Sequence, residues 1–187
     1  MARRILGITG APGAGKSTYA RDLVAASQVP AVHVPMDGFH LADSALDALG
    51  LRDRKGAPET FDAWGYAALL RRLRTADEPV WAPAFERELE QPLAGAILVR
   101  PEVELVVTEG NYLLLDRPEW RAVRAELEEV WFLDVPDDVR RARLVARHVE
   151  FGKSPDDAAR WVARVDDHNA ALVAATRASA DRVVSLP

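Results

Sequence analysis

The sequence has no cysteine, and its 187 residues include only three lysines, Lys16, Lys55 and Lys153. The absence of cysteine excludes disulfides, thiolate metal ligands and a cysteine nucleophile. Any metal ion must therefore be bound by oxygen or imidazole ligands.

Long apolar runs are also absent. No run approaches the ~18 residues of a membrane-spanning helix, and the apolar stretch near the start of the chain is too short for a secretory signal. Acidic residues outnumber basic ones, so the formal net charge is −5 and the pI is near 5.4. This balance lacks the basic footprint of nucleic-acid binding. We expect a cytoplasmic protein with no membrane and no nucleic-acid partner.

Apolar residues make up 49% of the chain, which is enough for one sizeable core, so we expect a single domain over residues 1–187. Short β-like runs alternate with helical ones. This α/β pattern predicts βαβ units and a mostly parallel sheet with helices on both faces. The expected strands are 3–9, 31–34, 104–110, 129–135 and 182–186. The expected helices are near 16–26, 62–75, 137–151 and 155–178.

Two segments do not fit the alternation. Residues 77–101 carry prolines and show no clean period, so they are expected to be either irregular or a small β excursion. Residues 43–61 are rich in turn-forming residues and are expected to be mostly loop.

The stretch GAPGAGKST, residues 10–18, matches G-x-x-x-x-G-K-[ST], the Walker A or P-loop motif, between a predicted strand and a predicted helix. Its backbone N–H groups surround the β-phosphate of a nucleotide, and the helix N-terminus adds its positive end. Lys16 is expected to bridge the β- and γ-phosphates, and Ser17 to offer its hydroxyl to Mg²⁺. A chance glycine-rich turn is disfavoured by the full motif in this context. The predicted nucleotide-binding residues are Gly10, Ala11, Pro12, Gly13, Ala14, Gly15, Lys16, Ser17 and Thr18.

The motif indicates ATP or GTP and leaves the reaction open. The Asn-Lys-x-Asp motif that recognises guanine is absent, because Asn111 precedes Tyr112 and Asn169 precedes Ala170. A Ras-like GTPase is therefore disfavoured.

Three carboxylates, Asp37, Glu109 and Asp134, come at the ends of predicted strands. Because ligands of a parallel sheet bind beyond the carboxyl ends of its strands, we expect such residues to meet the P-loop at one edge. Phosphoryl transfer to an alcohol needs a base for the hydroxyl and an acid for Mg²⁺ or its waters, roles that suit Asp37 and Glu109. The alternatives are a turn residue and a solvated strand end. Asp134 is interpreted as a helix-start residue.

Residues 137–153 form an arginine-rich helical segment. Arg143 and Arg147 are four apart and share a face, which suits a lid that closes on transferring phosphates. His148 either belongs to the same surface or is a cation at the helix end. A solvated face is favoured instead for two residues, Arg140 and Arg141.

Together GAPGAGKST, MDGFH, GAPETFD, TEGNYLLLD and the arginine-rich helix resemble the P-loop small-molecule kinases, which include uridine kinase, nicotinamide riboside kinase, pantothenate kinase and phosphoribulokinase. The resemblance runs from Ile5 to about Val184. It is strongest to a bacterial branch labelled nucleoside/nucleotide kinase-like or fructose transport system kinase. It implies a P-loop NTPase three-layer sandwich with a central, mostly parallel sheet. A small helical lid is implied at about 140–155 and a substrate-side insertion at about 77–101.

The resemblance also implies roles for single residues. Asp37 would be the general base for the acceptor hydroxyl, and Glu109 would join Ser17 in holding Mg²⁺. The catalytic residues implied are Asp37, Lys16, Arg143 and Arg147. The substrate-binding residues implied are Asp37, His40, Phe61, Asp62 and Arg87. Tyr112 and Trp120 are further pocket candidates, with core packing as the alternative for each aromatic residue.

We therefore expect an ATP- and Mg²⁺-dependent kinase that transfers the γ-phosphoryl group to a hydroxyl of a small metabolite. Nucleosides, ribosides, pantothenate-like alcohols and sugars all fit as acceptors. The alternative is a nucleotide-dependent regulatory or chaperone-like P-loop ATPase, in which Asp37 would be dispensable. The expected partner is the small-molecule substrate, and a homodimer is left open.

Overall fold

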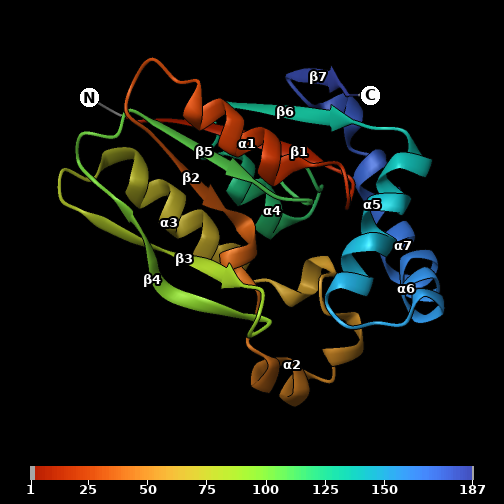
Figure 1. Cartoon of the computed structure of the whole chain (residues 1–187). Coiled ribbons are helices and arrows are strands. Elements are labelled where there is room, and N and C mark those ends of the chain that lie inside the picture. Colours follow the sequence, from red (N-terminus) through yellow and green to blue (C-terminus); the bar gives the residue numbers. More distant parts are fainter. Residues whose placement is uncertain (1–2, 187) are drawn as a thin grey trace.

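The computed structural model describes residues 3–186, and a five-stranded parallel sheet forms its centre (Figure 1). The strand order is β2-β5-β1-β6-β7, and every neighbouring pair is parallel. These strands confirm all those expected from the alternating pattern. They are β1 (Arg4–Gly10), β2 (Ala31–Pro35), β5 (Leu105–Glu109), β6 (Glu129–Asp134) and β7 (Arg182–Ser185).

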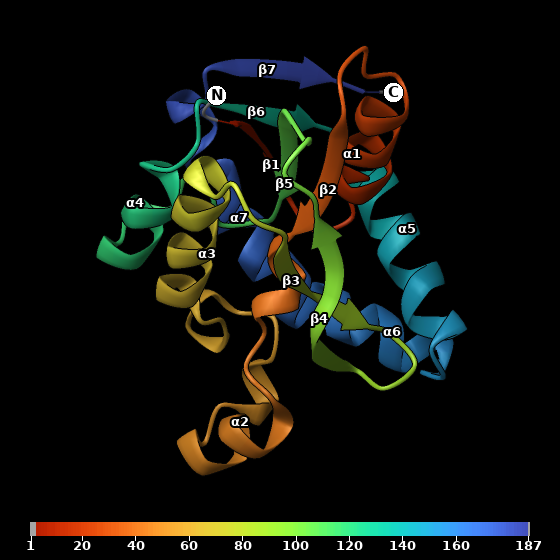
Figure 2. The same cartoon turned by 90° about the vertical axis from the view of Figure 1, so that its left-hand side faces the viewer.

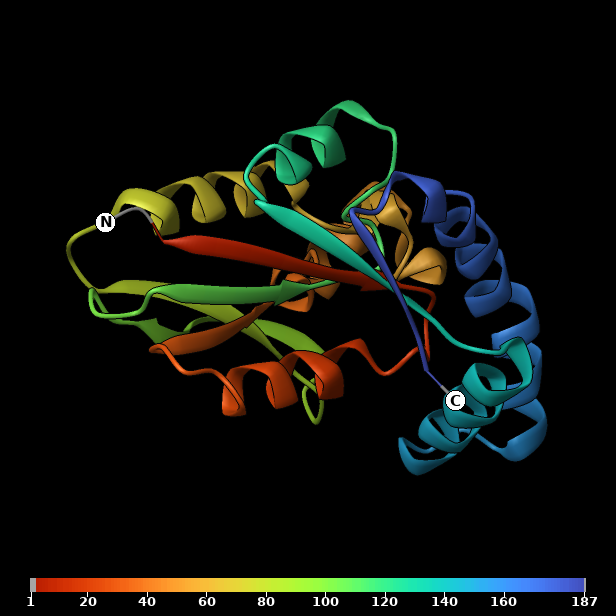
Figure 3. The ribbon, with the colours of Figure 1, turned by 90° about the horizontal axis from the view of Figure 1, so that it is seen from above.

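Helices cover both faces of the sheet, which gives the three layers expected of this fold (Figures 2 and 3). Helix α1 (Lys16–Ala25) covers one face, where Ala20 packs with Ile8 and Leu133. A larger core fills the space under the helices of the other face. Those helices are α3 (Ala63–Thr75), α4 (Pro118–Arg124) and α7 (Asp167–Ala174).

A buried chain of hydroxyl groups ties α3 to the sheet. The Thr108 hydroxyl donates to the Val34 carbonyl oxygen over 2.5 Å. Because that hydroxyl has only one proton, its oxygen must accept the hydrogen bond from the Tyr66 hydroxyl, which is also 2.5 Å away. Burial raises the pKa of Tyr66, which keeps the phenol protonated as the donor.

Residues 77–101 form an antiparallel hairpin, so the β alternative for this segment is correct. Strand β3 (Val80–Glu86) pairs with β4 (Gln91–Val99), and the register shifts between Ala82 and Ala84. Pro83 lies at this irregularity, where a strand tolerates a residue without an N–H. The hairpin packs against the end of β2, because a Cβ at Gly38 would lie 2.5 Å from the Pro83 carbonyl oxygen.

The C-terminal helices lie beyond the carboxyl end of the sheet (Figures 1 and 3). Helix α5 (Asp137–Glu150) follows β6, and α6 (Pro155–Trp161) begins after Ser154. The Ser154 hydroxyl caps α6 by accepting a hydrogen bond from the Asp157 N–H over 3.1 Å. The single helix expected over 155–178 is divided, because a π-helical turn at Val162–Asp166 separates α6 from α7.

Two short helices were not expected from the sequence. Helix α2 (Asp43–Leu49) interrupts the loop-rich segment 43–61 and projects from the body of the molecule (Figure 2). Helix α4 begins at Pro118 and is equally short. Helices of this length show too few turns for a clear apolar period, and packing rather than propensity stabilises them. Among residues 3–186, no helix is both long and apolar enough to cross a membrane.

The hydroxyl chain gives a test of how α3 is held on the sheet. We expect Tyr66→Phe to lower the free energy of unfolding by about 1–2 kcal/mol, because Thr108 loses its buried donor. Urea denaturation followed by circular dichroism measures the change. Tyr19→Phe on α1 is the matched control, since no hydrogen bond of its hydroxyl is present within residues 3–186. Equal midpoints for the two variants would contradict the assigned hydrogen bond.

Candidate active site

The loop between β1 and α1 is shaped for close backbone approach. Gly13 has φ +81°, and a Cβ there would lie 2.6 Å from the Arg140 carbonyl oxygen. Only glycine fits such a position without strain. The first N–H groups of α1 have no side-chain cap, so they are available to an anion at the mouth of this loop.

Lys16 is folded into the loop. Its ammonium donates to the carbonyl oxygens of Gly10 (3.0 Å) and Ala11 (3.1 Å). Burial lowers the pKa of Lys16 to about 8, although the charges of Glu109 and Asp37 act in the opposite direction. The structure thus brings together the P-loop lysine and the two carboxylates selected from the sequence.

Glu109 ends β5 and is only 4% exposed. The Ser17 hydroxyl donates to Glu109 Oε1 over 2.8 Å, and His33 Nε2 lies 3.5 Å from the same oxygen. Burial pushes the pKa of Glu109 upward, but His33, Lys16 and Ser17 outweigh it and hold the pKa below its usual value. Glu109 is therefore a buried anion and not a solvated strand end.

The pair of Ser17 and Glu109 fits a magnesium ion. Mg²⁺ prefers oxygen ligands and binds through one or two carboxylates together with substrate phosphates, without a dedicated protein cage. One hydroxyl and one carboxylate meet this need beside the P-loop. No cluster of three or more ligating side chains occurs within residues 3–186.

Asp37 lies in a 3₁₀ turn, Met36–Phe39, directly after β2. The backbone of Asp37 is used by its neighbour, because its carbonyl oxygen lies 2.8 Å from His40 Nδ1. Its carboxylate, in contrast, has no hydrogen bond or ion pair with any of residues 3–186. The alternative of a turn or capping residue therefore finds no support in the contacts of this side chain.

The aromatic candidates divide into two groups. His40 is stacked between Phe61 and Phe85, with ring centroids 4.0 and 4.7 Å away. Burial lowers the pKa of His40, so its neutral form is favoured. Tyr112 is 1% exposed and Trp120 is 0% exposed, and both pack in the core, where the buried Phe61 ring also contacts them. The core-packing alternative is thus correct for these two.

Asp62 lies at the start of α3, where its carboxylate accepts a hydrogen bond from the Gly65 N–H over 2.8 Å. It is the N-cap of this helix, a sufficient reason for its presence. Its backbone N–H donates to the Phe39 carbonyl oxygen over 2.9 Å, which places it beside the turn that holds Asp37.

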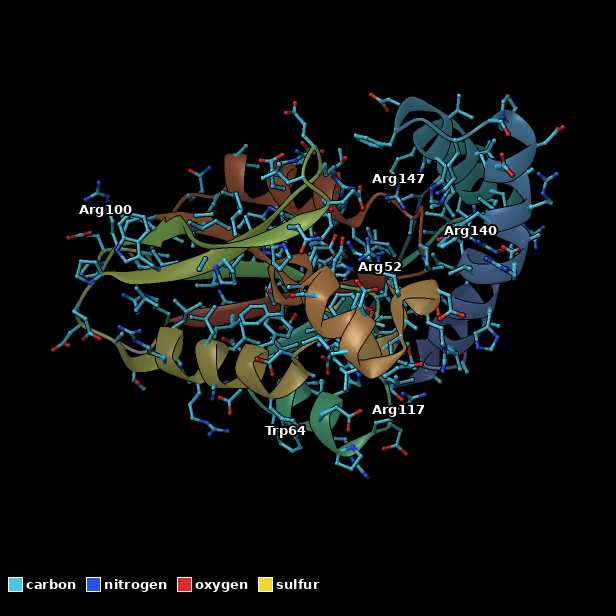
Figure 4. The ribbon with its side chains drawn as sticks, turned by 90° about the horizontal axis from the view of Figure 1, so that it is seen from below. Arg52, Trp64, Arg100, Arg117, Arg140 and Arg147 are labelled. Carbon is cyan, nitrogen blue, oxygen red and sulfur yellow. The ribbon has the colours of Figure 1, made fainter. Side chains whose placement is uncertain are left out.

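The arginines of α5 have different surroundings (Figure 4). Arg143 reaches the P-loop, since its Nη1 would lie 3.6 Å from a Cβ at Gly15. Arg147 is half-buried, and burial lowers its pKa. Arg140 is buried and not on a solvated face, because its side chain is 3% exposed and pairs with Asp137 and Asp167. Arg141 is half exposed, as expected.

Ion pairs hold two further residues, His148 and Asp134. His148 lies in the last turn of α5, as the helix-end alternative has it, and its Nε2 is held 2.9 Å from Asp166 Oδ2 in the π-helical turn. Asp134 pairs with Arg177 over 3.0 Å, and the cap of α5 is Pro136. Asp134 is therefore not a helix-start residue.

Sequence reasoning missed two residues of the site. His33 lies on β2 beside Glu109, and Lys55 lies under the hairpin turn, where its ammonium contacts Asp43 Oδ1 (2.8 Å) and the Phe85 ring. The only signal for His33 was a polar residue inside an apolar strand. For Lys55, no local signal exists, because its partners lie 12 to 35 positions away in the chain.

Known proteins resemble this chain over most of its length. Residues 5–186 match the model of the phosphoribulokinase / uridine kinase family. The crystal structure of a "putative fructose transport system kinase" from Silicibacter sp. TM1040 is 41% identical, covers 98% of this chain and 90% of its own, and superposes with a TM-score of 0.91. The ATP-dependent kinase-like protein notR' of Aspergillus versicolor is 39% identical over 132 residues, 66% of this chain and 77% of the relative. YggC of Escherichia coli K12 is 34% identical over 189 residues, 98% of this chain and 78% of the relative.

The contact between Gly13 and α5 can be tested with a matched glycine. We expect Gly13→Ala to weaken ADP binding at least about tenfold, because the added Cβ must displace either the loop or the Arg140 carbonyl. Gly50→Ala is the control, since Gly50 also has positive φ (+66°) but nothing lies within 4 Å of where a Cβ would be. Isothermal titration calorimetry measures both affinities. Similar affinities in the two variants would contradict a role for close packing at Gly13.

Proposed function

This chain belongs to the phosphoribulokinase / uridine kinase family, and we propose that it is an ATP- and Mg²⁺-dependent kinase for a hydroxyl group of a small metabolite. Membership of the family makes it a P-loop kinase that uses a nucleotide. The proposal concerns the donor, the metal ion, the class of acceptor and the roles of the residues. A nucleoside, a riboside, a pantothenate-like alcohol and a sugar all have the required hydroxyl.

The observation that carries the proposal is an unpaired carboxylate beside a phosphate cradle. Asp37 has no partner among residues 3–186, yet its charge acts on Lys16 and on Arg147. A carboxylate that only served structure would be expected to cap a helix or pair with one of these cations. One that must accept a proton from a substrate has to stay available.

The P-loop binds the donor in this proposal. Backbone N–H groups at the start of α1 hold the β-phosphate, and Lys16 exchanges its bonds to the Gly10 and Ala11 carbonyls for the β- and γ-phosphates. Arg143 reaches the same loop, and Arg147 follows one turn later on α5. Both guanidinium groups would neutralise charge on the phosphoryl group during transfer.

Ser17 and Glu109 would hold the magnesium ion. When bound, the ion would reduce the negative charge of the nucleotide's phosphates. The Ser17 hydroxyl donates a hydrogen bond to Glu109, and Glu109 stays ionised because His33 and Lys16 lie next to it. The ionised carboxylate can bind either the ion or one of its waters.

Asp37 would act as the general base for the acceptor. The acceptor oxygen forms a bond to the γ-phosphorus, the bond from that phosphorus to the bridging oxygen breaks, and the hydroxyl proton passes to the Asp37 carboxylate. His40 and Phe61, which stack beside the Asp37 turn, would bound the acceptor site. Asp62 lies beside Phe39, to which its backbone is hydrogen-bonded, and Arg87 lies on the turn of the β3–β4 hairpin.

We further propose that residues 1–187 act as one domain with two adjustable parts. Residues 140–155, which comprise most of α5 and the turn before α6, would be the lid over the phosphates. Residues 77–101, the β3–β4 hairpin, would form the acceptor side. The hairpin packs on the Asp37 turn through Pro83 and Gly38, which supports this division.

The base is tested by Asp37→Asn. We expect turnover to fall by about 10²–10⁴-fold, because the amide cannot accept the proton. The affinity for Mg·ATP should change little, because the P-loop and Lys16 are intact. ADP release, measured with a panel of nucleosides, ribosides, pantothenate and sugars, reports turnover, and calorimetry reports binding. Asp77→Asn is the matched control, since Asp77 is exposed and its carboxylate makes no hydrogen bond or ion pair with residues 3–186.

The same experiment separates the alternative function. A regulatory or chaperone-like ATPase would hydrolyse ATP slowly without an acceptor, and Asp37→Asn would leave that rate unchanged. Full turnover of an acceptor by Asp37→Asn would show that Asp37 is not the base.

A further inference from the structure

We propose that the acceptor carries an anionic oxyacid group, either a phosphate monoester or a carboxylate, which Arg87 and Arg147 bind together. This inference rests on the proposed kinase function. It narrows the class of acceptor and assigns to the hairpin a binding role that the phosphate cradle does not need.

The starting observation is that the arginines around the site lack protein partners. Several other arginines of the chain pair with carboxylates, as Arg140 does with Asp137 and Asp167 and Arg124 does with Asp181. Arg87 and Arg147, in contrast, have no carboxylate within 4.0 Å and make no side-chain hydrogen bond among residues 3–186. A guanidinium group without a partner is ordinary on an open surface, but Arg147 is half-buried.

Arg143 and Arg147 do not reach the same place. Arg143 lies against the P-loop at Gly15 and is therefore positioned for the nucleotide. Arg147 follows one turn later, about 6 Å farther along α5. The charges of Asp37, which follows β2, and of Arg87 and Glu90, on the hairpin, are close enough to Arg147 to shift its pKa. Figures 1 and 2 show the turn of the β3–β4 hairpin beside the C-terminal end of α5, the end that carries Arg147.

Arg87 is on a turn whose position is fixed. The last pair of the hairpin ladder is Glu86 with Gln91, so Arg87 begins the turn. The Lys55 ammonium donates to the Glu90 carbonyl oxygen in this turn, and the Gln91 side chain accepts a hydrogen bond from the Asp43 N–H over 3.2 Å. The hairpin turn is therefore attached to the segment that follows Asp37 and His40.

The charges around Arg87 and Arg147 favour the binding of an anion. Burial lowers the pKa of Arg147, and the nearby positive charge of Arg87 lowers it further. Lys16 adds a third positive charge, since the charge of Arg147 also lowers the Lys16 pKa. Of the acidic groups that act on Arg147, Asp166 already pairs with His148, while Asp37 and Glu90 do not lie within 4.0 Å of it. Two neighbouring positive charges, Arg87 and Arg147, that have no carboxylate of residues 3–186 within 4.0 Å favour an oxyanion ligand.

The chemistry of such a ligand follows from the donors. Each guanidinium group presents a planar fork that matches two oxygens of a phosphate or carboxylate. With the anionic group held between Arg87 and Arg147, the rest of the acceptor lies toward His40 and Asp37. Its hydroxyl can then approach the carboxylate of Asp37. A neutral nucleoside or sugar would leave both cations without a partner.

Matched acceptor pairs test this inference. The pairs are glycerate and glycerol, pantothenate and panthenol, ribose 5-phosphate and ribose, and a nucleoside 5′-monophosphate and its nucleoside. ADP release is measured with each member for the unmodified protein and for Arg87→Gln. Arg100→Gln is the control, because Arg100 is also exposed and without a carboxylate partner but lies at the far end of the hairpin (Figure 4).

We expect turnover with at least one anionic member and little with its neutral counterpart. Arg87→Gln should raise the KM for that acceptor at least tenfold and leave the KM for ATP and the kcat nearly unchanged. Arg87→Lys should restore part of the affinity, while Arg100→Gln should behave as the unmodified protein. Activity with phosphate esters and not with carboxylates, or the reverse, identifies the anionic group.

Two results would overturn the inference and leave the kinase function intact. One is turnover of neutral members as fast as of anionic ones, and the other is an acceptor KM that Arg87→Gln does not change. A binding measurement covers the case without turnover. With the P-loop filled by Mg·ADP, calorimetry with the anionic members should show binding that Arg87→Gln weakens, and absence of binding overturns the inference. Failure of the kinase function itself would appear differently, as ATP hydrolysis that is insensitive to both acceptor and Asp37→Asn.

Discussion

The buried ammonium of Lys16 is the interaction on which the rest of the site depends. A cation this deeply buried would be costly without compensation. Two carbonyl oxygens of its own loop and the charges of Glu109 and Asp37 supply that compensation. The loop is therefore held in shape without a nucleotide, and phosphate oxygens can replace the carbonyls when a nucleotide binds. Glu109 supplies the larger part of the charge compensation from the end of β5, which neighbours β1 in the sheet.

Helix α5 links this loop to the C-terminal helices. Its backbone contacts Gly13, and its buried Arg140 is held between Asp137 on the same helix and Asp167 on α7. Removing either carboxylate would leave the buried guanidinium group of Arg140 with fewer partners, which is destabilising. The N-terminal end of α5 is consequently fixed against the P-loop. The far end, with Arg147, joins α6 through the exposed turn at Gly152, where the proposed lid would move.

Much of the fold could be predicted from the sequence because its signals are local. The strands are short apolar runs, and the motif of residues 10–18 requires its own strand and helix. The hairpin of 77–101 could not be assigned because its ladder is irregular at Pro83 and its pattern has no clean period. Helices α2 and α4 could not be predicted, because seven residues give too few turns to show a helical period of apolar residues.

In the candidate site, too, local features could be predicted from the sequence and long-range contacts could not. Residues that belong to a local motif, such as Lys16 and Ser17, were found together with their neighbours. The buried state of Arg140 and the pairing of His148 with Asp166 could not be found, because both depend on the packing of α5 against the π-helical turn and α7. An arginine that pairs and one that stays available look identical in the sequence. Only the fold distinguishes Arg140, which has two carboxylate partners, from Arg147, which has none within residues 3–186.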